Sequence, residues 1–344
     1  MPKRENQGSG NLCDQRKGLG RKRCPDGTMH KGNMVPAGRV LELPKLNTVV
    51  EDRLRESAAA ILSGESDGTG FLHSILCQTS LPYRDPGDQV REWERRQGNA
   101  ALKLLAGEAI SPDSGEWVKI GLPFGPKARL VFCFINTRAV LTQSPLIEVG
   151  DSLTDFVTRE LKMANKGQNM RKVKDQMTRL AASHIRMGYT DGQRSYNAHG
   201  AIISDFDLWF PKDERQRVLW PSVVKLSGDY FESLLSHAVP LEMRALSALS
   251  HSALALDIYA WLAQRLHRIE RRKRAFIPWA ALKAQFGPDF AAMNNFRRKF
   301  LIALREAHTV YRVAKIDVTK EGLFLYNSPP PIAKTGVVLR LPPA

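Results

Sequence analysis

The clearest pattern of apolar and polar positions runs from Asn294 to Tyr326. On a helical wheel the apolar residues of its first half share one face and polar residues occupy the opposite face. The apolar face consists of Phe296, Phe300, Ala303, Leu304 and Ala307, and the polar face carries Asn294, Arg298 and Arg305. Two short apolar segments follow, separated by Thr-Lys-Glu-Gly ending at Gly322, which predicts a β-hairpin. A helix backed by a hairpin is typical of a winged helix, whose helix can enter a major groove.

The same order of elements is predicted twice. Corresponding elements are spaced by roughly 125 residues, which favours two winged-helix modules in tandem. The first module is predicted to contain helices over 130–141, 153–163 (with Ser152 as N-cap) and 169–187, strands over 146–149, 202–210 and 218–226, and a wing tip over 189–200. The second is predicted to contain helices over 254–269 and 279–286 before the Asn294 helix.

The remaining segments predict an extension before the modules and polar termini around them. Helices are expected over 49–62, 93–106 and 229–249, and a strand over 117–124. The expected fold class is α+β and mainly helical: two tandem winged-helix domains with a preceding α/β extension and a disordered basic N-terminal arm. The expected divisions are an arm over 1–45, an extension over 46–124 packed on the first module, module 1 over 125–228, module 2 over 229–332 and a tail over 333–344.

Charge then narrows the class of partner. The chain has 51 Lys and Arg against 35 Asp and Glu, a net charge of +16 and a sequence pI near 9.9. Such a balance favours a polyanion, either nucleic acid or an acidic membrane surface. Because no run approaches the ~18 apolar residues of a membrane span and no apolar signal region is present, a cytoplasmic protein without membrane partners is expected.

Candidate DNA contacts are the exposed cations and amides of the two predicted recognition helices and of the segment before the second. In module 2, we expect Asn294, Asn295, Arg297, Arg298 and Arg305 to read bases and Arg271, Arg272, Lys273 and Arg274 to contact phosphates. In module 1, the corresponding residues are Arg171, Lys172, Lys174, Arg179 and Arg186. A solvated basic face would give the same pattern. Asp175 could accept from cytosine or pair with Arg171 or Arg179, and pairing is favoured. His184 is expected to pack in the core.

Catalytic and cofactor patterns are weak. Asp205 and Asp207 lie two apart on a predicted strand, as in metal-dependent nucleases, but no third ligand is placed to complete a site. The chain has no His-x-His pair and no G-x-x-x-x-G-K-[ST] phosphate loop. Its four cysteines, Cys13, Cys24, Cys77 and Cys133, lack metal-binding spacing. We therefore expect a non-enzymatic binding protein with no cofactor and no metal.

Several segments, in their order, resemble the RepA family of plasmid replication initiators. These segments are 76–86 (LCQTSLPYRDP), 121–130 (GLPFGPKARL), 135–140 (INTRAV), 255–266 (ALDIYAWLAQRL), 296–300 (FRRKF) and the Ser-Pro-Pro-Pro turn at Ser328. The resemblance implies a bacterial, plasmid- or nucleoid-associated protein that binds repeated sequences in duplex DNA at a plasmid origin. It further implies that the protein helps to open the origin and recruits the host initiator DnaA and the replicative helicase, with a homodimer in equilibrium with a DNA-binding monomer. A dimeric winged-helix repressor or partition adaptor on a palindromic operator is the alternative.

Overall fold

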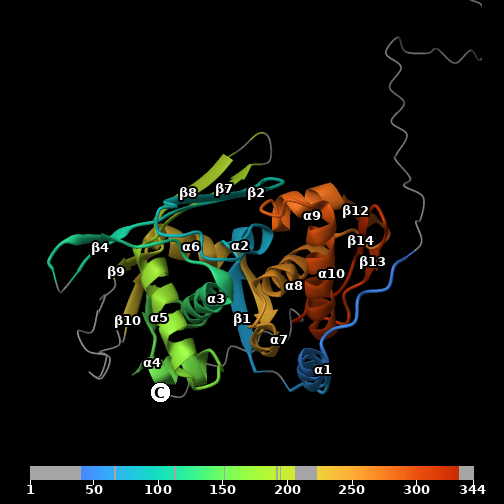
Figure 1. Ribbon diagram of the computed structural model, residues 1–344, viewed down its shortest axis with the longest axis horizontal. Coiled ribbons are helices and arrows are strands. Elements are labelled where there is room, and N and C mark those ends of the chain that lie inside the picture. The colour runs from blue at the N-terminus through green and yellow to red at the C-terminus, as the bar shows by residue number, and fades with distance from the viewer. Residues whose placement is uncertain are drawn as a thin grey trace, which may run out of the picture. The chain divides into compact units, whose positions relative to one another are not determined.

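The computed structural model describes residues 40–65, 67–111, 114–150, 152–190, 193, 195–205 and 223–332. These residues belong to one compact unit, 38–344, and form a mixed α/β fold (Figure 1). Most of the expected basic arm, with Cys13 and Cys24, and the expected tail over 333–344 lie outside the described residues. Where the description begins, the backbone N–H of Leu41 donates to the carbonyl of Val318 at 2.7 Å. The chain therefore enters the fold beside the last β-hairpin.

The C-terminal part contains three α-helices, a short 3-10 helix (Leu266–Arg268) and one antiparallel sheet. It consists of α8 (Ala253–Arg265), β12 (Arg274–Pro278), α9 (Trp279–Phe286), α10 (Met293–Val310), β13 (Ile316–Val318) and β14 (Gly322–Tyr326). The strand order is β12-β14-β13. We call residues 253–326 the second repeat. Its helices and its hairpin follow the sequence prediction, whereas β12 was not predicted because Arg274 and Pro278 interrupt its apolar positions.

Aromatic packing fixes α10 against the rest of the second repeat. Phe296 and Phe300 are fully buried, as the helical wheel predicts. The ring of Phe300 lies 5.9 Å from that of Trp279 and 5.5 Å from that of Phe286, measured between centroids. Trp261 of α8 meets Phe286 edge to face at 5.3 Å. One continuous aromatic cluster therefore joins α8, α9 and α10.

The middle of the chain repeats this topology. It contains α3 (Gly125–Thr142), β6 (Leu146–Glu148), α4 (Leu153–Asp155) continued by a π-helix (Phe156–Glu160), α5 (Gly167–Ala182), β9 (Ile203–Asp205) and β10 (Val223–Leu226). The strand order β6-β10-β9 corresponds position for position to β12-β14-β13. We call residues 125–226 the first repeat. Residues 206–222, which include part of the predicted strands and Asp207, lie outside the described residues.

The first repeat contains an inserted β-hairpin where the sequence predicts the end of a helix and a wing tip. The predicted helix 169–187 ends at Ala182, and β7 (His184–Thr190) and β8 (Ser195–Ala201) follow it. The predicted helix 93–106 is wrong: this segment forms β2 (Glu92–Gln97) and β3 (Ala100–Leu105) around Gly98, whose φ is +52°. Buried Ala100, Leu102 and Leu104 alternate with less buried positions, a period of two that was mistaken for a helical one.

The two hairpins join into one four-stranded sheet of order β2-β3-β7-β8. The segment 189–200 is therefore the turn and second strand of an inserted hairpin, and its reading as a wing tip is corrected. His184 and Arg186 lie exposed on β7, so the expected packed position of His184 is also wrong. The sequence could not show this arrangement, because the partner of β7 is a strand about 80 residues earlier in the chain.

The N-terminal extension is interleaved with both repeats. It comprises α1 (Thr48–Leu62), β1 (Thr69–His73), α2 (Ser74–Gln78), the β2–β3 hairpin, and a small hairpin of β4 (Glu108–Ile110) and β5 (Trp117–Lys119). β1 pairs with β11 (Ala238–Glu242), which lies between α6 (Gly228–His237) and α7 (Met243–Ala248). The predicted helix over 229–249 is thus interrupted by a strand, and that strand is held by a segment from the extension.

A buried ion pair connects the first helices of the two repeats. The Nε and Nη2 atoms of Arg129 on α3 donate to the two carboxylate oxygens of Asp257 on α8, at 2.6 and 2.8 Å. The same guanidinium donates to the carbonyls of Leu81, Pro82 and Gly125 at 2.8, 3.2 and 2.9 Å. Three of the segments that resemble RepA, 76–86, 121–130 and 255–266, therefore meet at one guanidinium. Burial opposes its charge, but the Asp257 carboxylate outweighs burial and raises the pKa of Arg129.

A buried histidine makes the fold sensitive to acid. The Nδ1 atom of His73 accepts the backbone N–H of Ile75 at 3.1 Å, and its Nε2 lies 3.0 Å from the hydroxyl of Ser233. Burial, with the neighbouring His237, lowers the pKa of His73 to about 3. Protonation of Nδ1 would remove the acceptor that caps α2.

We expect the free energy of unfolding to fall by about 1.4 kcal/mol for each pH unit below 6.5, because the unfolded chain binds a proton that the folded chain binds only near pH 3. Chemical denaturation between pH 7 and pH 5 measures this slope. His73→Asn retains an acceptor for Ile75 and should flatten the slope, and an unchanged slope in this variant would assign the acid sensitivity to other groups.

Candidate nucleic-acid interface

The amino-terminal half of α10 presents the first basic surface. Asn294, Asn295, Arg298 and Lys299 are all exposed. The N-cap residue, Ala292, has no side-chain hydrogen bond to the helix, and the first turn contains no acidic residue. Free backbone N–H groups and the helix dipole add positive potential to that of the side chains. Cations at this end of a helix repel the dipole, so an external anion would relieve the repulsion.

The hairpin turn lies at the same end of α10. The guanidinium of Arg297 lies over the ring of Trp279, 4.8 Å from the centroid. The indole N–H of Trp279 donates to the carbonyl of Thr319 at 3.2 Å, which ties α9 to the turn of the β13–β14 hairpin. Exposed Lys320 follows. A Cβ on Gly322 would lie 2.1 Å from the carbonyl oxygen of Ile277, so only glycine lets the hairpin approach β12 this closely.

The carboxyl-terminal half of α10 is covered by α1. Glu51 Oε1 lies 3.7 Å from Arg305 Nη2, and the Arg305 side chain is 37% exposed. Glu306 is buried, and its carboxylate contacts Nε2 of His251 at 3.2 Å. The helical wheel places Arg305 on the outward face, which is correct for the helix alone, but no local pattern predicts that α1, about 250 residues earlier in the chain, packs there. Only the first two turns of α10 therefore expose their polar face to solvent.

The basic segment 271–274 lies at the other end of the second repeat. Arg274 pairs with Tyr326 on β14, whereas the hairpin turn adjoins Pro278 at the opposite end of the same strand pair. The guanidinium of Arg274 lies 4.3 Å from the centroid of the Phe324 ring, and Lys273 forms an exposed ion pair with Glu270 at 2.8 Å. Arg271 shares a cavity with His308, near the end of α10. These cations therefore do not lie beside Asn294 and Arg298, and their expected contacts with phosphates stay a prediction.

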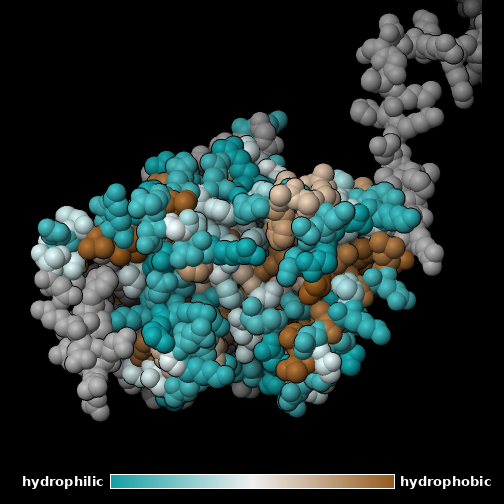
Figure 2. Space-filling model, in the orientation of Figure 1, coloured by the Kyte–Doolittle hydropathy of each residue, from teal (hydrophilic) through white to brown (hydrophobic). Residues whose placement is uncertain are grey.

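The corresponding helix of the first repeat, α5, presents the second basic surface. Arg171 and Lys172 are exposed, and Lys174 is half-buried, so burial lowers the pKa of its ammonium group. As in α10, the N-cap residue (Lys166) makes no side-chain hydrogen bond to the helix and no acidic residue occupies the first turn. Figure 2 shows hydrophilic side chains over α5 and both hydrophilic and hydrophobic ones over α10. The third helix of each repeat thus shares the same electrostatic character.

Arg179 and Arg186 are placed differently from these residues. The Arg179 guanidinium lies 3.0 Å from Asp175, 3.6 Å from Asp85 and 3.5 Å from Asp88, and its side chain is only 13% exposed. The ion pair with Asp175 was the favoured interpretation of the sequence, while the two carboxylates from the extension were not anticipated. Arg186 lies on β7 opposite Lys103, away from the helix on which it was predicted.

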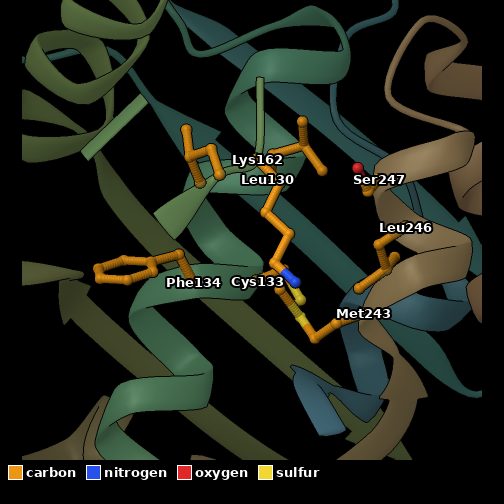
Figure 3. Close-up of a pocket in the computed structure, with 8 residues that line it drawn as sticks. Leu130, Cys133, Phe134, Lys162, Met243, Leu246 and Ser247 are labelled. Atoms are coloured by element: carbon orange, nitrogen blue, oxygen red, sulfur yellow. The ribbon is translucent and has the colours of Figure 1, made fainter. Parts of the chain in front are cut away.

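The structure adds no further side chain to the candidate catalytic and metal-binding residues within the ranges that it describes. Asp205 ends β9, and within the described ranges no group of three or more His, Cys, Asp or Glu side chains could hold a metal ion. An apolar cavity between α3 and α7, lined by Leu130, Cys133, Phe134 and Met243 among others, measures about 10 Å³ (Figure 3). That volume holds at most one water molecule. Burial raises the pKa of the Cys133 thiol to about 12, so this cysteine is not a nucleophile at neutral pH.

These features define a mixed α/β protein with a repeated helix-and-sheet topology, in which the third helix of each repeat has an open, basic amino end. Residues 122–280 match a family model described as "Plasmid encoded RepA protein". The resemblance to RepA is therefore confirmed for these residues, which make up slightly less than half of the chain. No curated protein matches the chain at a significant level.

Two solved structures also resemble the chain. A crystal structure of RctB domains 2 and 3 (residues 155–483) covers 72% of this chain and 87% of its own, with 12% identity and a TM-score of 0.41. A selenomethionine derivative of the same two domains covers 72% and 89%, with 12% identity and a TM-score of 0.43. Among the helices of the described residues, none is both long and apolar enough to cross a membrane.

Proposed function

We propose that this protein is a plasmid replication initiator that binds repeated sequences in duplex DNA at the origin. Each repeat is a winged-helix domain in this proposal: the order helix, strand, two helices and two strands, with the last strand central in the sheet, supports that assignment. The observation that carries the proposal is that both copies of this topology present a basic, uncapped third helix. Binding, without catalysis, is the activity proposed.

We propose a smaller set of base-reading residues than the sequence predicts. In the second repeat, Asn294, Asn295 and Arg298 are free to meet base edges, with Arg297 held over Trp279 beside them. In the first repeat, Arg171 and Lys172 take this position and Lys174 lies next to them. We infer that Arg179 has a structural role, because its guanidinium is surrounded by three carboxylates.

Origin opening follows from binding at several repeats. Bound copies that bend the DNA concentrate strain in adjacent steps, and A·T-rich steps that stack weakly open first. Recruitment of DnaA and the replicative helicase, and a homodimer that dissociates to a DNA-binding monomer, are further parts of the proposal that derive from the family. A cytoplasmic, plasmid-associated location belongs with them.

A band-shift titration on the DNA that flanks the gene tests the proposal. The titration includes excess random competitor and a salt series, because a basic chain binds any DNA at low ionic strength. We expect a ladder of discrete complexes on direct repeats that survives competitor. A single dimeric complex on a palindrome would favour the repressor function instead, and loss of all binding at moderate salt would contradict duplex recognition.

Arg298→Ala is expected to weaken binding to the repeat by about 1–3 kcal/mol and to relax the preference at one base position. The physical reason is that Arg298 is exposed on the open end of α10, where a guanidinium can pair bidentately with guanine. Titration on repeats substituted at each position measures both effects. Exposed Arg84, which lies outside both third helices, provides the control Arg84→Ala. Equal weakening of Arg298→Ala on random DNA would show a phosphate contact.

A further inference from the structure

A third basic surface lies at the carboxyl-terminal end of α10 and borders an open cleft. The cleft has a volume of about 500 Å³, and Arg271, His308, Lys315, Ile316 and Asp317 are among its lining residues. Exposed Arg272 follows Arg271 in the chain, and exposed Arg312 lies three residues before Lys315. The cleft is broad and open to solvent, so a segment of another molecule can enter it. We call it the C-terminal cleft.

The walls of the cleft are held in place by hydrogen bonds. The amide of Asn327 donates to the carbonyl of Ile269 at 2.6 Å, and the hydroxyl of Tyr326 donates to the Asp317 carboxylate at 2.7 Å. Nε2 of His308 donates to the carbonyl of Ala314 at 3.0 Å. Burial lowers the pKa of His308, so its imidazole is neutral at pH 7. The positive charge of the cleft therefore comes from Arg271 and Lys315. The hydrogen bonds described above fix the segments on which these two residues lie.

The position of the cleft argues against duplex DNA as its ligand. His308 and Asn294 are 14 residues apart on α10, a rise of roughly 20 Å. Helix α1 covers α10 between them, and Glu51 of α1 places a carboxylate beside Arg305. Asp317 adds a carboxylate inside the cleft, and Ala314 and Ile316 give it an apolar wall. The Asp317 carboxylate opposes any anion, but it already accepts a hydrogen bond from Tyr326, and the apolar wall gives a peptide side chain a contact that a phosphate backbone cannot use.

We propose that the C-terminal cleft binds an acidic segment of a partner protein, whose carboxylates pair with Arg271 and Lys315 while an apolar side chain packs on Ile316. The guanidinium can hold a carboxylate bidentately, and the ammonium group supplies a second point of charge. The cleft and the open end of α10 can be occupied at the same time, because they lie at opposite ends of the helix. A DNA-bound molecule would thus remain able to hold a protein.

Fluorescence anisotropy on the full chain tests this assignment. The probe is a short fluorescein-labelled peptide of alternating glutamate and leucine, and the matching glutamine–leucine peptide is the neutral control. Three variants with equal charge change are compared: Arg271→Glu/Lys315→Glu in the cleft, Arg298→Glu/Lys299→Glu at the open end of α10, and Arg84→Glu/Lys119→Glu away from both. Each variant is first checked for an unchanged thermal unfolding midpoint, and band shifts on repeat DNA are recorded in parallel.

We expect the cleft variant to lose at least about tenfold in affinity for the acidic peptide, a change of about 1.4 kcal/mol. The other two variants should retain peptide binding, and repeat binding should fall furthest for Arg298→Glu/Lys299→Glu. The proposal is overturned if the wild-type chain binds the two peptides equally, or if the cleft variant binds the acidic peptide as wild type does. A cleft variant that loses repeat DNA more than Arg84→Glu/Lys119→Glu would assign the cleft to DNA phosphates.

Discussion

Arg129→Ala is expected to lower the free energy of unfolding by about 3–5 kcal/mol. The substitution leaves the Asp257 carboxylate buried without its bidentate partner and removes the donors to the carbonyls of Leu81, Pro82 and Gly125. Unpaired buried charge carries a large desolvation cost, which the native guanidinium offsets. Urea denaturation followed by circular dichroism measures the change.

The double variant Arg129→Met/Asp257→Leu separates the pair from its surroundings. Removing both charges and keeping apolar volume should recover much of the stability lost in Arg129→Ala, although the three carbonyls still lack a donor. Recovery would show that the ion pair adds little net stability. Its main role would then be to fix the position of α3 against α8. A loss below about 1 kcal/mol in the single variant would contradict the buried, fully bonded arrangement.

Phe300→Ala should cost about 3–5 kcal/mol and should also reduce affinity for repeat DNA. Phe300 is fully buried between Trp279, Phe286 and Phe296, so alanine leaves a cavity where α10 packs on α9. Because Arg297 and Arg298 are positioned by this packing, a loosened α10 presents them less well. Thermal unfolding and band shifts on the same preparation measure both effects.

Two variants on the same helix provide the controls for Phe300. Phe300→Leu keeps much of the apolar volume and should cost roughly half as much as alanine. Lys299→Ala changes the adjacent exposed position and should alter stability by no more than about 0.5 kcal/mol. If Phe300→Ala lowered stability as expected but left repeat binding intact, the amino end of α10 would not be the reading element.

The parts of the fold that could be predicted are those with a local signal. The face of α10, the turn before Gly322 and the three helices of the second repeat follow from helical spacing and turn chemistry, and each agrees with the structure, whereas β12 was not predicted. Predictions failed where strand and helix periods compete in short segments, as at 92–105 and 184–190. Short apolar runs do not distinguish the two states until a partner strand is known.

For the candidate interface, the sequence predicts which residues are exposed on each helix, but it does not predict which of them form ion pairs. The exposure of Asn294, Asn295, Arg298, Arg171 and Lys172 agrees with their positions on amphipathic helices. The sequence did not reveal that Arg179 is enclosed by Asp85 and Asp88, or that segment 271–274 lies far from the amino end of α10. Both facts depend on contacts between residues distant in the chain.

The basic charge, the repeated order of elements and the resemblance to RepA follow from the amino-acid sequence, because composition, periodicity and motif order are properties of the chain. Tertiary structure decided which cations are open, which are paired, and how α1 and the β2–β3 hairpin interleave with the repeats. The physical reason is that exposure and ion pairing depend on the distance between side chains in space. Helical and strand periodicity fixes only the direction in which a side chain leaves its own element.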